Sequence, residues 1–181
     1  MPANAIEDRF RTVTDPAEAQ AVLGRAAFAK TVGIALEKNR ENMLPLFSMG
    51  SEITGAAFAF SHDGKEEVVS ILVGGTLTAE ALLKQISALT ESRAEISMFD
   101  VKQDMKNFRV CRPENVFDVH VAAYLLNPLK SSYEPNDVAR EYLDLTIDGK
   151  LSEEKKRCYE AYTMYQGAAI LREKLQESGM E

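Results

Sequence analysis

Five short stretches of the chain have the patterning of β-strands, with apolar residues at alternate positions or in a short run. They cover residues 9–13, 31–37, 54–60, 67–73 and 94–99. In the second stretch, Val32, Ile34 and Leu36 form one apolar face. Asp63 and Gly64 separate the third stretch from the fourth, and this pair predicts a hairpin because glycine accepts a positive φ.

Capping residues and apolar spacing predict the helices. Asp15 is followed by Pro16 and, three residues after the cap, by Glu18, which is typical of a helix start. A second helix is expected from about Thr78 to residue 90. From Asp100 onward the pattern is helical to the end, and residues 152–177 predict one long amphipathic helix with apolar residues at steps of three and four.

The predicted order of elements is β-α-β-β-β-α-β followed by helices. This order favours an α/β fold in which a mixed β-sheet is flanked by helices, with a helical C-terminal part. The length of 181 residues fits a single domain over residues 1–181, with a core at about 9–145. The helix at about 152–177 then either packs on this core or leads away from it.

Composition and charge limit the classes of function. No run of 18 or more apolar residues is present, and the acidic first ten residues do not form a secretory signal. Cys111 and Cys158 lack the spacing of a metal site, so we expect buried, reduced thiols and a cytoplasmic protein. The formal net charge of −7 predicts weak binding to DNA by the isolated chain, because lysine and arginine supply most affinity for phosphates.

Residues 117–128, with the sequence FDVHVAAYLLNP, and residues 131–143, with the sequence SSYEPNDVAREYL, form the most specific motif of the chain. They closely resemble two consecutive helices in the 3′–5′ proofreading exonuclease domain of bacterial family A DNA polymerases, the DNA polymerase I type. In that family, the "FD" pair ends a strand and opens the first helix. The resemblance implies a ribonuclease-H-like fold, which the predicted order of strands fits.

The resemblance also implies where a metal site would lie. Active members of the family hydrolyse DNA with two Mg²⁺ or Mn²⁺ ions, which are held by four carboxylates. The family's Asp-x-Glu motif falls on Ala35 and Glu37, the acid of its second motif falls on Asp104, and its Tyr-x3-Asp motif falls on Tyr162 and Gln166. Two of the four carboxylates are therefore absent, and the aspartate lost at position 35 is the one that bridges both metals in the family.

These substitutions predict a degenerate site without exonuclease activity and without a cofactor. Glu37 and Asp104 could hold one hydrated Mg²⁺ weakly, or they could be ordinary surface charges. If the placement is correct, Ala35, Glu37, Asp104 and Gln166 should meet at one point of the fold.

The expected function is structural. The domain would lie beside the polymerase domain of the same parent chain, contact DNA through that enzyme, and support DNA synthesis in replication and repair. One alternative is an active metal-dependent 3′–5′ DNA exonuclease with a rearranged site, for which Asp100 and Asp118 are the local candidates for a third acid. Another is a module that binds nucleic acid without cutting it.

Overall fold

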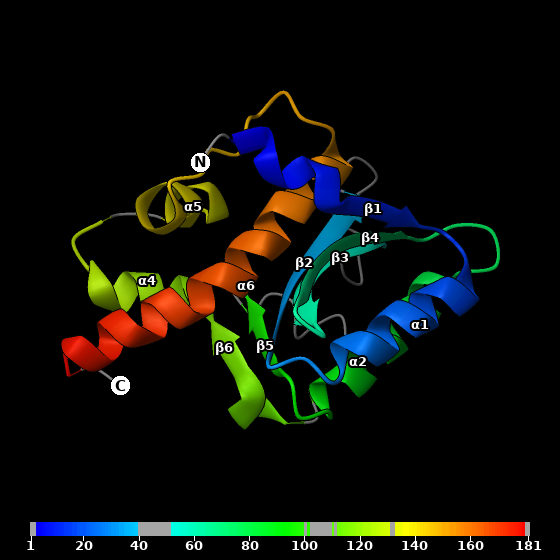
Figure 1. Cartoon of the computed structure of the whole chain (residues 1–181), viewed down its shortest axis with the longest axis horizontal. Coiled ribbons are helices and arrows are strands. Elements are labelled where there is room, and N and C mark those ends of the chain that lie inside the picture. The colour runs from blue at the N-terminus through cyan, green and yellow to red at the C-terminus, as the bar shows by residue number, and fades with distance from the viewer. Residues whose placement is uncertain are drawn as a thin grey trace, which may run out of the picture.

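A six-stranded mixed sheet forms the centre of the molecule in the computed structural model, which describes residues 3–39, 52–99, 101, 110, 112–130 and 133–179 (Figure 1). The strands lie in the order β1-β4-β3-β2-β5-β6. Their bounds are Phe10–Val13 for β1, Thr31–Asn39 for β2, Glu52–His62 for β3, Lys65–Leu72 for β4, Glu95–Met98 for β5 and Val116–Asp118 for β6. Strands β2, β3 and β4 are antiparallel neighbours, whereas β1, β5 and β6 join the sheet in parallel.

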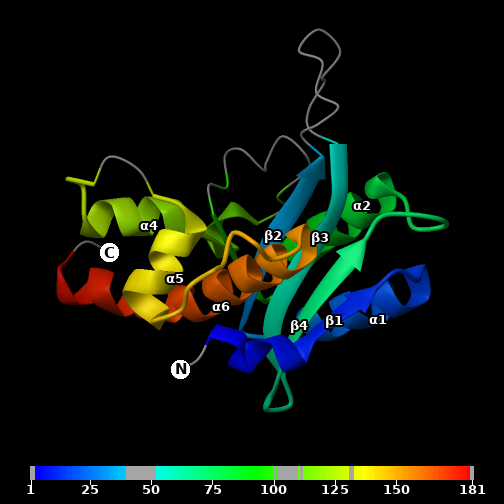
Figure 2. The same ribbon diagram turned by 90° about the horizontal axis from the view of Figure 1, so that it is seen from above.

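Helices cover both faces of this sheet (Figures 1 and 2). One face packs against α1 and α2, and the other packs against α6, with α4 and α5 on the far side of α6. The bounds are Ala3–Arg9 for the 3-10 helix η1, Pro16–Ala26 for α1, Ala79–Thr90 for α2, Pro113–Asn115 for the 3-10 helix η2, Val119–Leu126 for α4, Pro135–Leu143 for α5 and Glu153–Glu177 for α6. The predicted α/β class, a mixed sheet flanked by helices, is confirmed.

The local signals of the sequence act as expected. The Asp15 carboxylate accepts the backbone N–H of Glu18 at 3.0 Å, and the Thr78 hydroxyl accepts that of Ala81 at 3.1 Å. Asp63 and Gly64 have φ values of 51° and 78°, so the hairpin between β3 and β4 has the primed type of turn that follows the twist of the strands. Cys158 is buried as predicted, whereas Cys111 lies outside the described residues.

The prediction that the chain is wholly helical after Asp100 is wrong. Val116, Phe117 and Asp118 form β6, which pairs in parallel with residues 96–98 of β5. A strand of three residues is too short to show a period of two, so the apolar pattern could not identify it. The family resemblance did indicate it, because Phe117 and Asp118 stand where "FD" ends a strand.

Helix α6 is more deeply buried than one amphipathic face would allow. Cys158 and Tyr159 are buried, and so are all four residues from Ala161 to Met164, because the sheet lies on one side of the helix and α4 and α5 lie on the other. The sequence left open whether this helix packs on the core, and the structure places it across the centre of the sheet. Among the described helices, none combines the length and apolar character needed to cross a membrane.

Candidate functional site

The side of β2 that faces α6 carries Gly33, Ala35 and Glu37 at alternate positions. The apolar row of Val32, Ile34 and Leu36 points to the opposite side, into the core beneath α1 and α2, as the sequence predicted. The two sides of β2 therefore have different roles.

Gly33 is where α6 touches the sheet. A Cβ atom at this position would lie 2.1 Å from the backbone oxygen of Ala161 and 2.5 Å from the backbone nitrogen of Tyr165. These distances are shorter than any real carbon contact, so only glycine allows the helix backbone to approach so closely. Sequence reasoning missed this role, although a glycine inside a strand is a signal of close backbone approach.

Ala35 lies next along this side of β2 and is 8% exposed. Its methyl group belongs to an apolar cluster with Ala57 of β3 and with Ala161 and Tyr162 of α6. The position that would carry the bridging aspartate is thus filled by apolar contacts between strand and helix.

Glu37 lies at the rim of this contact and is half-buried. Its carboxylate accepts the Thr54 hydroxyl at 3.2 Å, at a point where the pairing of β2 with β3 shifts register. Gly55 lies opposite, and a Cβ there would be 3.3 Å from the Glu37 Oε2 atom, so this glycine leaves space for the carboxylate. Burial raises the pKa of the nearby Cys158 thiol to about 12, and the charges of Glu154 and Glu37 act in the same direction.

Gln166 belongs to a different polar cluster. Its amide donates to the Glu66 carboxylate on β4 at 2.7 Å and to the Tyr162 hydroxyl at 3.4 Å. Arg9 forms an ion pair with the same Glu66. Burial, with the Glu66 charge as a smaller cause, raises the pKa of Tyr162. Tyr162 and Gln166 therefore do lie one turn apart on one helix face, as the sequence predicted.

The expected meeting of Gln166 with Glu37 is not seen. Glu66, which Gln166 contacts, pairs with Ser61 of β3, whereas Glu37 pairs with Gly55 of the same strand. Gly55 and Ser61 are six residues apart on β3, which corresponds to about 20 Å along the strand. Gln166 and Glu37 therefore lie toward different ends of this strand. The cause is the course of α6: Cys158 is near Glu37, but the backbone of residues 161–165 already lies over Gly33, so later residues move away from Glu37. Asp104, the fourth position, lies outside the described residues.

Asp118 is a candidate third acid for a rearranged site, but both of its carboxylate oxygens accept hydrogen bonds from backbone N–H groups. One carboxylate oxygen accepts the N–H groups of His120 and Val121 at 2.9 and 3.2 Å, and the other accepts that of Val101 at 2.9 Å. It caps α4 and holds the segment after β5. Asp100, the other candidate, is not among the described residues.

The described residues do not form a two-metal centre. Such a centre needs several carboxylates converging on two ions about 4 Å apart. Across the described residues, no group of three or more histidine, cysteine, aspartate or glutamate side chains is placed to hold a metal. With a methyl group at position 35 and Gln166 turned to Glu66, Glu37 has neither of these two expected neighbours.

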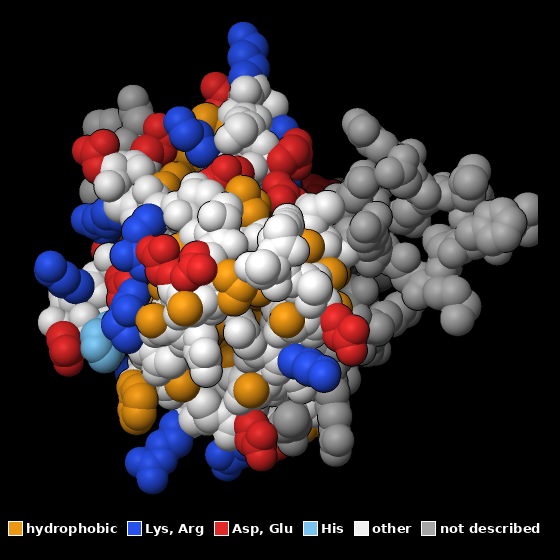
Figure 3. Space-filling view, turned by 90° about the vertical axis from the view of Figure 1, so that its right-hand side faces the viewer, with side chains coloured by type: hydrophobic (Ala, Val, Ile, Leu, Met, Phe, Trp, Pro, Cys, Tyr) orange, Lys and Arg blue, Asp and Glu red, His pale blue; other side chains and the backbone are white. Residues whose placement is uncertain are grey.

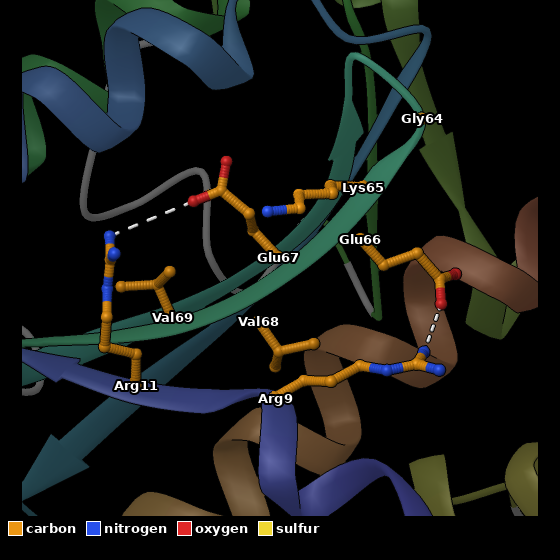
Figure 4. A pocket seen from close by; sticks show the side chains of 8 residues that line it. All are labelled: Arg9, Arg11, Gly64, Lys65, Glu66, Glu67, Val68 and Val69. Atoms are coloured by element: carbon orange, nitrogen blue, oxygen red, sulfur yellow. Dashed lines mark hydrogen bonds and ion pairs between the residues drawn. The ribbon is translucent and has the colours of Figure 1, made fainter.

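A shallow depression of about 480 Å³ lies along β1 and β4 (Figure 4). Its two arginines face carboxylates: Arg9 pairs with Glu66, and Arg11 lies 3.9 Å from Glu67. Figure 3 shows lysine and arginine interspersed with aspartate and glutamate over the described part of the face seen there. Neither the depression nor this face therefore forms a basic surface for nucleic acid. The depression is lined by Arg9, Arg11, Gly64, Lys65, Glu66, Glu67, Val68 and Val69.

Comparison with known proteins establishes the fold. No protein-family model and no curated protein matches the chain. Among solved structures, the POL domain of Pol1 from M. smegmatis, in complex with DNA primer-template and dNTP, superposes with a TM-score of 0.67 at 19% identity over 92% of this chain. RNase D of Escherichia coli, an exoribonuclease involved in structured RNA processing, superposes with a TM-score of 0.70 at 12% identity over 94% of the chain. The EXO domain of Aedes aegypti Nibbler gives a TM-score of 0.63 at 13% identity over 94% of this chain and 91% of its own.

The chain therefore has the ribonuclease-H-like fold of 3′–5′ exonuclease domains. It spans 28% of the length of the Pol1 chain and 46% of the RNase D chain.

Proposed function

We propose that this chain is a non-catalytic exonuclease-like domain of a family A DNA polymerase, and that its role is to pack beside the polymerising part of the same protein. Two observations support the parent enzyme. The motif of residues 117–143 resembles that family, and the chain superposes over 92% of its length on a structure that includes the POL domain of a Pol1.

The single observation that carries the loss of catalysis is the contact between β2 and α6. Ala35 is buried against Ala161 and Tyr162, and the backbone of α6 rests on Gly33. A metal bridge at position 35 would need a carboxylate and a cation where these apolar groups are in contact. In this proposal, the Ala35 methyl group and its apolar neighbours fill the place that a carboxylate and a metal would need.

A structural role also agrees with the charge of the molecule. The net charge is −7, and the arginines of the depression along β1 and β4 are compensated by Glu66 and Glu67. DNA would then be held by the remainder of the parent enzyme, in which this domain supports synthesis during replication and repair. By itself, the chain should bind duplex DNA with a dissociation constant of roughly 10⁻⁴ M or weaker at physiological salt.

A nuclease assay tests the absence of catalysis. The purified chain is incubated with labelled single-stranded and 3′-mismatched DNA in Mg²⁺ or Mn²⁺, and we expect no shortening. Metal-dependent shortening from the 3′ end that disappears in Asp104→Ala would overturn the proposal and support the rearranged exonuclease. Sub-micromolar DNA binding without cutting would instead support a nucleic-acid-binding module.

The variant Ala35→Asp tests the filled site directly. A carboxylate under α6 should lower the free energy of unfolding by about 3 kcal/mol, because a buried charge without a partner is costly. Excess Mn²⁺ should not restore the loss. If Mn²⁺ does restore it, and the restoration disappears when Glu37→Gln is added, then position 35 still belongs to a metal site.

A further inference from the structure

Helix α4 has an apolar outer face without a partner in the described structure. Val121, Tyr124 and Leu125 lie on successive turns of this face and are 50%, 49% and 44% exposed. Leu129, in the turn that follows, is 95% exposed. We call these four residues the α4 face. Helix α4 contains no charged residue, although 27% of the chain is charged.

The inner face of the same helix explains why the outer one cannot turn inward. Val119, Ala122 and Ala123 are buried against Leu171 and Leu175 of α6. Asp118 fixes the start of the helix through its capping hydrogen bonds. Among the described residues, the outer face of α4 is therefore left uncovered while the inner face is packed.

The size of the α4 face limits what can cover it. With about 200 Å² for a large side chain, the exposed fractions correspond to roughly 500 Å² of mainly apolar surface. A stable complex of separate proteins buries about 800 Å² on each partner. Two domains joined in one chain bind each other at high effective concentration, and their interfaces bury as little as about 300 Å² on each side.

The position of the α4 face adds a second argument. The C-terminal half of α6 packs on α4 through Leu171 and Leu175. The C-terminal end of α6 therefore lies at the same end of the molecule as α4, as both ribbon views show (Figures 1 and 2). A segment that follows α6 would begin beside α4, at the same end of the molecule as the α4 face.

We propose that the α4 face is the surface on which the polymerase part of the parent chain docks after α6. This inference rests on the proposed function, which supplies the following domain. The uncharged helix suits such a contact, because a domain interface then forms without removing a charge from water.

The test uses a double variant that carries both Tyr124→Ser and Leu125→Ser. This variant is made in two proteins, the chain 1–181 and the longer parent chain. Phe28→Ser is the matched control, since Phe28 is 86% exposed in the connection between α1 and β2, outside the α4 face. We expect the double variant to leave the melting temperature of the chain 1–181 within about 4 °C of the original. In the parent chain, it should raise the rate of protease cleavage just after α6 by roughly tenfold or more, because about 55 Å² of lost apolar burial already corresponds to that factor. Phe28→Ser should change neither quantity.

Three outcomes would overturn the inference. The cleavage rate in the parent chain could match that of the Phe28→Ser control. The double variant could unfold the chain 1–181 itself, which would make the residues part of its own core. The chain 1–181 could sediment as a dimer that the double variant dissociates, which would assign the face to a second copy. A primer-extension assay of the parent chain separates this test from the test of the proposed function. If the parent chain shows no template-directed synthesis, both the proposed function and the docking on the α4 face are refuted. If the parent chain is active but its cleavage rate is unchanged, only the docking on the α4 face is refuted.

Discussion

The contact of α6 with Gly33 predicts a large effect from the smallest possible substitution. In Gly33→Ala, the new methyl group would lie 2.1 Å from the Ala161 oxygen, 2.5 Å from the Tyr165 nitrogen and 3.0 Å from the Tyr165 Cα. All three atoms belong to helix backbone, so no side chain can rotate away to make room. The helix must lift from β2, and the apolar contacts of Ala35 with Ala161 and Tyr162 must loosen with it.

The cost follows from the nature of the obstacle. Inserting a methylene into a well-packed core costs about 1–3 kcal/mol. We place Gly33→Ala near the upper end, at about 3 kcal/mol, because backbone must move. For a domain of this length, that loss corresponds to a fall in melting temperature of roughly 6–12 °C.

Two other glycines of the chain provide matched controls. A Cβ at Gly167, on α6 itself, would lie 3.7 Å from the Val138 Cγ1 atom, which is an ordinary contact. A Cβ at the exposed Gly24 of α1 would meet nothing within 4 Å. Alanine at either helical position should raise stability by about 0.5–1 kcal/mol, since glycine disfavours a helix interior.

The measurement is urea unfolding of the three alanine variants, followed by circular dichroism. We expect Gly33→Ala to move the midpoint down and the two controls to leave it unchanged or move it up. A Gly33→Ala protein within about 1 kcal/mol of the original would show that α6 does not rest on β2 at this point. The account of the filled site would then fail with it.

Two further predictions concern ionisable groups. Arg25 donates to both carboxylate oxygens of Glu67, at 2.9 and 2.8 Å, and this hydrogen bonding holds the pKa of Glu67 below its usual value. Glu67→Gln should therefore lower the unfolding free energy by about 1 kcal/mol at neutral pH. The difference in stability between the original protein and the variant should shrink as the pH falls below about 4, because Glu67 then becomes protonated. A stability difference that persists at pH 3 contradicts this prediction. Burial raises the pKa of the Cys158 thiol to about 12. This thiol should therefore react with iodoacetamide only after unfolding, which peptide mass spectrometry can follow. Rapid labelling in the native protein would refute its burial.

The fold was predictable because its signals are local. Asp15 and Thr78 accept the N–H groups three residues ahead of them, and Asp63 with Gly64 makes the turn, without help from distant residues. The strand β6 could not be predicted from local signals. It has three residues, and its place in the sheet depends on pairing with β5, about 20 positions earlier in the chain.

The candidate site was predictable only in part, because its geometry depends on how α6 crosses the sheet. The alternation in β2 correctly placed Ala35 and Glu37 on the side opposite Val32 and Ile34. The position of Gln166 could not be read in this way. Its partner Glu66 is 100 residues away, and the contact depends on the angle of the helix rather than on any spacing within it.

If the family's aspartate falls at position 35, as the resemblance implies, its replacement by alanine has a structural consequence as well as a chemical one. An aspartate beneath α6 would stay charged only with a cation beside it, so the stability of the strand–helix contact would depend on bound metal. Alanine removes that dependence, and its methyl group joins the contact with Ala57, Ala161 and Tyr162. The same change that would deprive the site of a metal ligand thus contributes to the packing of α6 on the sheet. The proposed role, in which the domain presents α4 at a fixed place, would benefit from this exchange, because Leu171 and Leu175 of α6 pack against α4.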